Sequence, residues 1–141
     1  MKIKSAEFLT SVASKEKFIN SNLFEFAFVG RSNCGKSSLI NALVNQKKLA
    51  KTSSTPGLTK LVNYFLINAK VKDFNADKNI EINSQDEAYP CFFVDLPGYG
   101  FSKMSKAEQV KVGQFIEEYL FHRAQISLII FLIDIRHSPT S

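Results

Sequence analysis

The apolar residues of this chain gather in four short runs, separated by polar or amphipathic segments. Three runs rich in aromatic and β-branched residues predict buried strands at residues 24–29, 61–67 and 91–95. The fourth, residues 127–134, is apolar almost throughout, which is typical of a parallel strand covered on both faces. These runs predict a sheet at the core of the protein.

Two segments carry apolar residues at helical spacing. The first begins at residue 36, and the second follows a capping-box pattern from Ser105 to Glu108 and is expected to reach about His122. The apolar positions are Leu39, Ile40, Leu43 and Val44 in the first segment and Val112, Phe115, Ile116, Tyr119 and Leu120 in the second. Alternating strands and helices predict an α/β fold with a largely parallel sheet and flanking helices.

Length and composition predict a single domain. The chain has 141 residues, of which 45% are hydrophobic and 22% charged, as in ordinary soluble domains. We expect residues 1–22 to form an N-terminal extension and residues 23–141 to form the domain itself. The polar stretch 68–89 is predicted to be an extended hairpin or a mobile surface loop.

The longest apolar run, residues 126–133, is far too short to span a bilayer, and the N-terminus has no signal-peptide pattern. We therefore expect a cytoplasmic protein with no membrane partner. The two cysteines, Cys34 and Cys91, have no evident disulfide or metal partner and are expected to be plain thiols.

The chain is basic, with a net charge of +5 and a pI near 9.2. Four lysines surround one loop: Lys47, Lys48, Lys51 and Lys60. This charge fits either a polyanionic partner or a solvated basic face, and charge alone leaves both open. No DNA partner is predicted.

Residues 30–37, GRSNCGKS, match the phosphate-loop pattern G-x-x-x-x-G-K-[ST]. A predicted strand precedes the loop and a predicted helix follows it, which is the order that this motif requires. Backbone N–H groups of such a loop surround phosphates at the helix N-terminus. Lys36 is expected to reach the β- and γ-phosphates of a nucleotide, and the Ser37 hydroxyl is expected to bind Mg²⁺.

A second candidate motif, Asp95-Leu96-Pro97-Gly98, has the form D-x-x-G and ends a predicted strand. This position places the Asp95 carboxylate at the edge of the sheet, where it can hold Mg²⁺ directly or through water. Gly98 is then expected to offer its backbone N–H to the γ-phosphate. The alternative is a simple Pro-Gly turn after a strand.

The loop from Thr55 to Thr59 lies where GTPases keep a segment that orders around the γ-phosphate and Mg²⁺. We expect Thr59 to complete the metal shell because Pro56 and Gly57 set a turn just before it. Thr55 is the second choice, and a turn without a ligand role is the alternative.

The segments GRSNCGKSSLINAL, TPGLTKLVNYF, VDLPGYGFS and FLIDIRH together resemble the bacterial EngB (YihA/YsxC) family of ribosome-assembly GTPases. That family falls in the TrmE-Era-EngA-YihA-Septin-like class, and the resemblance covers residues from about 24 to 137. It implies a P-loop NTPase fold of the Ras-like G-domain type and hydrolysis of GTP to GDP and phosphate. It also implies a role in large ribosomal subunit assembly, with that subunit or its rRNA precursor as partner, and a link to cell division and septation.

The resemblance also assigns site residues. It implies catalytic roles for Lys36, Thr59, Asp95 and Gly98, and Mg²⁺ ligation by Ser37 and Thr59, to which the strand-end position adds Asp95. The implied nucleotide-binding residues are Gly30, Arg31, Ser32, Asn33, Cys34, Gly35, Lys36, Ser37 and Ser38 in the loop, Gly57, Leu58, Thr59, Lys60 and Leu61 in the second segment, and Asp95, Leu96, Pro97 and Gly98 in the third.

Tyr99 stands where small regulatory GTPases place a glutamine that orients the attacking water. We expect hydrolysis to be intrinsically slow and to be completed by a ribosomal contact or by a monovalent cation. Asn33 motivates the cation, because related GTPases with G-x-x-N-x-G-K-S use that asparagine to help hold K⁺. The alternative is that Asn33 only shapes the loop.

GTPases of this kind recognise guanine with an Asn/Thr-Lys-x-Asp segment after a later strand and a Ser-Ala segment after another, and neither follows the D-x-x-G motif in this sequence. We therefore expect a truncated chain that lacks the C-terminal part of the domain, in which the strand at 127–134 becomes a sheet edge of poor stability and prone to swapping. Two other functions stay open: another P-loop NTPase or translation-class GTPase, and a nonenzymatic RNA-binding fragment.

Overall fold

The computed structural model describes residues 1–51, 61–83, 85–101 and 103–136. Five strands form one sheet in the order β1-β3-β4-β2-β5. Their bounds are Ala6–Val12 for β1, Phe24–Gly30 for β2, Val62–Ile67 for β3, Cys91–Asp95 for β4 and Ile126–Leu132 for β5. The four strands predicted from apolar runs are confirmed, with shifts of one or two residues at their ends.

The sheet is mixed, not largely parallel as the sequence suggested. β2 pairs in parallel with both β4 and β5, whereas β3 is antiparallel to β4 and to β1. Asn63, near the start of β3, pairs with Asp95 at the end of β4. β3 therefore begins beside the end of β4 and runs in the opposite direction. Apolar runs identify buried strands, but they carry no information on direction.

Strand β1 lies within the segment expected to be an N-terminal extension. It pairs with β3 along its whole length, from Ala6 opposite Ile67 to Val12 opposite Val62. The short 3₁₀ helix η1, Lys15–Lys17, follows. A boundary at residue 22 remains a prediction, but the backbone hydrogen bonds of the sheet already begin at residue 6.

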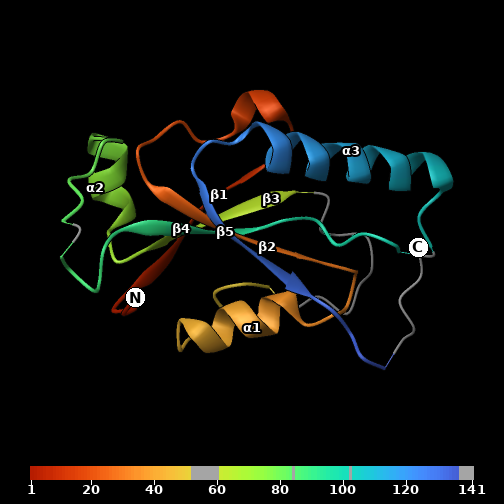
Figure 1. Ribbon diagram of the computed structural model, residues 1–141, viewed down its shortest axis with the longest axis horizontal. Helices are drawn as coiled ribbons and strands as arrows, with labels where there is room; N and C mark the ends of the chain where they lie inside the picture. Colours follow the sequence, from red (N-terminus) through yellow and green to blue (C-terminus); the bar gives the residue numbers. More distant parts are fainter. Residues whose placement is uncertain (52–60, 84, 102, 137–141) are drawn as a thin grey trace.

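Helices cover both faces of the sheet (Figure 1). The long helix α3, Lys106–His122, lies on one face and α1, Lys36–Leu43, on the other. Both helices begin at the predicted residue, and Ser105 Oγ accepts a hydrogen bond from the Glu108 N–H at 3.1 Å, as expected of a capping residue. None of the helices in the described ranges is long and apolar enough to cross a membrane.

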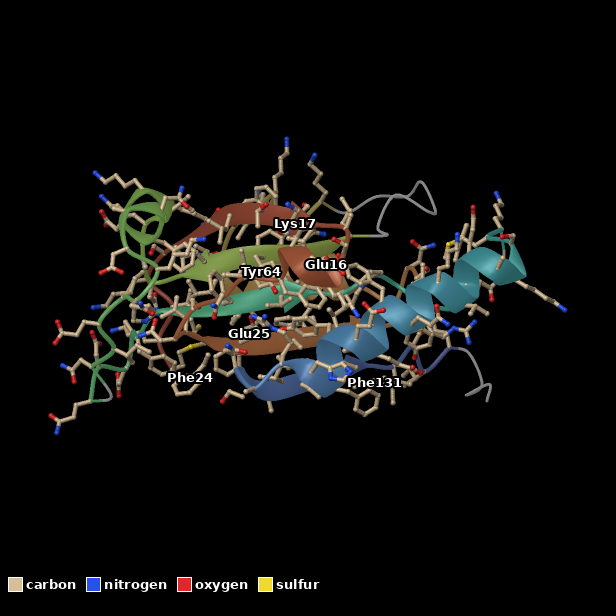
Figure 2. The ribbon with its side chains drawn as sticks, turned by 90° about the horizontal axis from the view of Figure 1, so that it is seen from above. Glu16, Lys17, Phe24, Glu25, Tyr64 and Phe131 are labelled. Atoms are coloured by element: carbon tan, nitrogen blue, oxygen red, sulfur yellow. The ribbon has the colours of Figure 1, made fainter. Side chains whose placement is uncertain are left out.

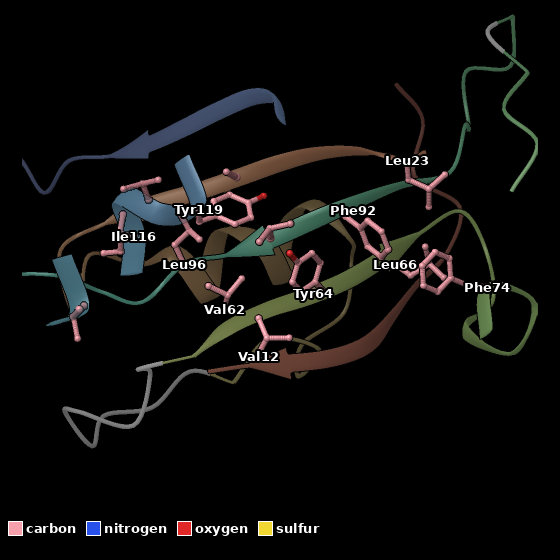
Figure 3. Packing of buried hydrophobic residues seen from close by; sticks show 14 of the residues in the cluster. Val12, Leu23, Val62, Tyr64, Leu66, Phe74, Phe92, Leu96, Ile116 and Tyr119 are labelled. Carbon is pink, nitrogen blue, oxygen red and sulfur yellow. The ribbon is translucent and has the colours of Figure 1, made fainter. Parts of the chain in front are cut away.

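The core is divided by the sheet into two clusters of buried side chains. Under α3, the rings of Tyr64 and Phe92 meet edge to face at 5.4 Å (Figure 3). Under α1, Ile40 and Phe28 are fully buried. The central strands β2 and β4 are therefore covered on both sides, which fixes the position of the loops at their carboxyl ends.

The polar stretch 68–89 contains a helix that the hydrophobic pattern did not predict. Helix α2, Val71–Ala76, buries Phe74 against Phe92 with ring centroids 5.3 Å apart. A single aromatic anchor in a six-residue helix leaves no 3.6-residue period, which is why the segment was predicted to be a hairpin or loop.

Strand β5 forms one edge of the sheet, and its faces are only partly covered. Leu128, Ile129 and Phe131 are 51%, 47% and 55% exposed. The covering of both faces that its apolar run suggested is therefore not found among the described residues, whereas its position at a sheet edge is confirmed.

Candidate functional site

The loop at residues 31–35 leaves the end of β2 and leads directly into α1. Gly30, the last residue of β2, has no room for a side chain, because a β-carbon there would lie against Cys34 Sγ and 3.2 Å from the Leu132 carbonyl oxygen. The first glycine of the motif is therefore required by the close return of the loop over the strand end.

Two loop residues adopt left-handed backbone conformations. Asn33 has φ of 63° and Gly35, at the N-cap of α1, has φ of 95°. Asparagine and glycine are the residues that tolerate this region best. The turn brings the first N–H groups of α1, which have no acceptor within the helix, to the end of the sheet. A helix N-terminus of this kind attracts anions.

Lys36 and Asp95 lie close together at the point where α1 begins and β4 ends. Lys36 Nζ is 3.6 Å from Asp95 Oδ1, and both residues are buried, at 8% and 3% exposed. This separation is longer than a hydrogen bond, so the contact is ionic. Asp95 Oδ1 is buried without a hydrogen-bond partner among the described residues.

Burial raises the pKa of the Asp95 carboxyl, and the charge of Lys36 opposes that shift. A buried carboxylate oxygen without a donor is costly unless it receives a cation or a proton. Asp95 therefore has the environment of a cation ligand. Ser37, the neighbour of Lys36 at the start of α1, supplies a partly exposed hydroxyl.

These oxygen donors fit Mg²⁺, which prefers one or two carboxylates or hydroxyls together with phosphate oxygens and water. Within the described ranges, no cluster of three His, Cys, Asp or Glu side chains could hold a metal by itself. The site thus suits a metal held jointly with a phosphate ligand, and it does not suit an all-protein metal cage.

The D-x-x-G segment lies directly against the phosphate loop. The Tyr99 N–H donates to the Gly30 carbonyl at 3.3 Å, and the Ser32 N–H donates to the Tyr99 carbonyl at 2.9 Å. A β-carbon at Gly98 would lie 2.8 Å from Ser32 Cα. Gly98 is therefore required by close packing of two backbones, in addition to its predicted role as an amide donor.

The structure brings together two of the three predicted segments. Residues Gly30 to Ser38 form the loop and the start of α1, and Asp95 to Gly98 pack beside them. Leu61 lies just before β3, whose Asn63 pairs with Asp95. Gly57, Leu58, Thr59 and Lys60, with the second-choice ligand Thr55, lie outside the described residues.

Two contacts at this site were not predicted from the sequence. Arg31 Nη2 donates to the Gly100 carbonyl at 3.4 Å, and the Tyr99 ring packs on Phe131 of β5 with centroids 6.3 Å apart. Gly100 has φ of 69°. The G-Y-G sequence at 98–100 was the available signal, because two glycines around one aromatic residue indicate a backbone held close to another segment.

A strand, a phosphate loop and a helix, with a D-x-x-G turn beside them, define the class of P-loop GTPase folds. The sequence model of the 50S ribosome-binding GTPase family matches residues 25–141, and the chain belongs to this family.

Within the family, the chain is similar to probable GTP-binding proteins EngB. It is 47% identical over 141 residues to that of Clostridium perfringens and 49% identical over 140 residues to that of Clostridium beijerinckii. It also resembles a crystal structure of a probable GTP-binding protein engB at 26% identity and a TM-score of 0.48, covering 76% of this chain and 47% of the other. The identities with the curated relatives confirm the resemblance to the EngB family. The chain spans 61% of the length of these curated relatives, and they cover 99 to 100% of it.

Proposed function

We propose that this chain carries the phosphate- and magnesium-binding part of a GTPase switch that acts in large ribosomal subunit assembly. The observation that supports the proposal most strongly is the buried pair of Lys36 and Asp95, whose Oδ1 has no hydrogen-bond donor among the described residues. The ammonium group of Lys36 and the carboxylate of Asp95, which can bind a metal ion, are adjacent where the phosphate loop meets the sheet. This is the arrangement that a magnesium-bound triphosphate requires.

Different residues of the chain bind the phosphates and the metal ion. The N–H groups of the loop and of the start of α1 surround the phosphates, and Lys36 neutralises charge on the β- and γ-phosphates. Ser37 and Asp95 would hold Mg²⁺, with Thr59 as the predicted third ligand. Bound Mg²⁺ would supply positive charge to the phosphate oxygens.

Hydrolysis of GTP to GDP and phosphate is the proposed reaction, with Gly98 donating its N–H toward the γ-phosphate. Tyr99 lacks the amide by which a glutamine positions water, and its ring packs on Phe131. We expect slow hydrolysis that a ribosomal contact or a bound K⁺ accelerates. The left-handed Asn33 supports a role in shaping the loop. Equal hydrolysis rates in K⁺ and Na⁺ by an intact relative would exclude the cation role.

The proposed partner is the large ribosomal subunit or its rRNA precursor, in agreement with the description of the family. The basic balance of the chain, 18 Lys and Arg against 13 Asp and Glu, is compatible with such a polyanionic partner. Lys47, Lys48 and Lys51 are exposed beyond α1. A cytoplasmic location and a connection to cell division and septation belong to the same proposal.

Calorimetric titration of GTP and GDP into the chain, with Mg²⁺ and with EDTA, tests the proposal. We expect binding that Lys36→Ala weakens by about 10- to 100-fold, because a charge-assisted contact to phosphate is lost. Asp95→Asn should remove most of the difference between Mg²⁺ and EDTA. Lys48→Ala is the matched control, since it removes the same charge from an exposed position.

Two results would contradict the proposal. Binding that Lys36→Ala leaves unchanged would exclude the loop as the phosphate site. RNA binding that weakens with salt but ignores the nucleotide would favour a nonenzymatic RNA-binding fragment. Competition between GTP and ATP in a longer protein that contains this chain would separate a GTPase from another P-loop NTPase.

A further inference from the structure

The residues that follow the D-x-x-G turn are bonded to the phosphate loop as a short parallel bridge between Arg31 and Tyr99. One hydrogen bond runs from the Tyr99 N–H to Gly30, at 3.3 Å, and the other from the Ser32 N–H to the Tyr99 carbonyl, at 2.9 Å. This bridge extends the parallel pairing of β2 with β4 beyond the ends of both strands. The backbone of Tyr99 therefore bonds the D-x-x-G segment directly to the phosphate loop.

The side chain of Tyr99 makes a second connection, to the edge strand. Its ring lies 6.3 Å from that of Phe131, with an angle of 32° between the planes. Phe131 pairs with Val29, the residue before Gly30, so the contact is anchored beside the base of the loop. Phe131 is 55% exposed and lies at the side of the sheet in Figure 2.

We propose that Phe131 is a positioning residue for nucleotide binding, which acts through Tyr99. The ring contact holds the Tyr99 carbonyl on the Ser32 amide and keeps Gly98 packed on the loop. The amide of Gly98 is thus set in place before a γ-phosphate arrives, which favours a triphosphate over a diphosphate. The preference for a triphosphate rests on the proposed function, whereas the mechanical coupling rests on the contacts alone.

The coupling can be tested without any nucleotide, by amide hydrogen exchange of Ser32 followed by NMR. Phe131→Ala should make Ser32 exchange about 3- to 10-fold faster, since an aromatic pair contributes roughly 0.5 to 1.5 kcal/mol. Ile129→Ala is the matched control, because Ile129 lies two residues before Phe131 on the same strand and is 47% exposed. This substitution should leave the exchange rate of Ser32 unchanged. Phe131→Leu should give an intermediate rate, and Tyr99→Phe should behave as the unsubstituted chain because it keeps both the ring and the carbonyl.

The functional part is tested by the affinities for GDP and for a non-hydrolysable GTP analogue in Mg²⁺. Phe131→Ala should weaken binding of the analogue about 3- to 10-fold and leave GDP binding within about twofold, again from the size of one aromatic contact. A general loss of stability would lower both affinities together. Equal changes for the two nucleotides, or unchanged exchange at Ser32, would overturn the proposal.

The two tests also separate this inference from the proposed function. A chain that binds neither nucleotide contradicts the proposed function, while the exchange rate at Ser32 still decides whether Phe131 holds the bridge. A chain that binds nucleotide through Lys36 but shows no effect of Phe131→Ala supports the function and excludes the positioning role.

Discussion

The hydroxyl of Tyr119 donates a hydrogen bond to the carboxylate of Glu25 at 2.7 Å, within the core beneath α3. Arg123, just after the helix, forms an ion pair with the same carboxylate. Glu25 is only 1% exposed, near the start of the strand that carries the phosphate loop at its other end (Figure 2). The network fixes the C-terminal end of α3 to β2, and burial beside Glu25 raises the pKa of Tyr119, which keeps its hydroxyl a donor.

Removal of Arg123 should therefore destabilise the chain strongly. Arg123→Ala leaves a buried carboxylate without its ion pair, for which we expect a loss of about 3 to 5 kcal/mol of unfolding free energy. Tyr119→Phe, which removes one hydrogen bond to a charged group, should cost about 1.5 to 3 kcal/mol. Urea denaturation measures both, with the exposed Lys111→Ala as a control. Similar urea midpoints for Arg123→Ala and the control would show that the ion pair of Arg123 with Glu25 contributes little to the free energy of unfolding.

Gly30 and Cys34 should be coupled in a double-mutant cycle. A β-carbon at residue 30 meets Cys34 Sγ first and the Leu132 carbonyl oxygen, at 3.2 Å, next. Gly30→Ala should cost about 1 to 3 kcal/mol by overpacking, and adding Cys34→Ala should recover part of that loss because the nearest obstacle is removed. Thermal melting of the four proteins gives the coupling. Strict additivity would contradict this packing.

The two cysteines should react at very different rates. Cys91 is buried, and burial raises the pKa of its thiol to about 12, so at pH 8 it remains protonated and unreactive. Cys34 is partly exposed in the loop. A thiol reagent should therefore label one cysteine quickly, and Mg²⁺ with GDP should slow that reaction. Cys34→Ser should abolish the fast phase, while fast labelling that persists in Cys34→Ser would show that Cys91 is accessible.

Strand β5 should make the isolated chain self-associate. Leu128 and Ile129 are about half exposed on successive positions of an uncharged edge strand, which is a template for pairing with another strand. We expect the sedimentation coefficient to rise with concentration, and Leu128→Lys with Ile129→Lys to suppress the rise. A monomeric chain that melts cooperatively at high temperature would contradict both this expectation and the predicted low stability.

Local sequence patterns predicted those parts of the fold and of the site that depend on residues close together in the sequence. The Gly30-to-Ser37 motif and the Ser105 cap define their own geometry, and both were found where they were predicted. Contacts between distant residues leave weaker signals. Glu25, the single charged residue in the apolar run FEFAFV, was the only sign in the sequence of its network with Arg123. The direction of β3 left no sign in the sequence.

The polar stretch shows the same limit, because Phe74 alone anchors α2. At the site, residue types predicted Lys36 and Asp95 but not their separation, which depends on the pairing of β2 with β4. The role of Thr59 remains a prediction, since it falls outside the described residues. Tyr99 was singled out for the glutamine that it replaces, whereas its backbone bonds and its contact with Phe131 came only from the structure.

The position of β2 in the sheet also has a consequence for the order of events during synthesis. Both of its partners come later in the chain: Phe24 pairs with Cys91, and Glu25 pairs with Ile126. The entropy of closing such long loops is lost before the contacts between the strands can stabilise the fold, and this makes the pairing slow. The phosphate loop is translated before β4 and β5, so the strand that leads into it is not fully paired until β5 has emerged. A nascent chain should thus be unable to retain a nucleotide until most of these residues have been translated.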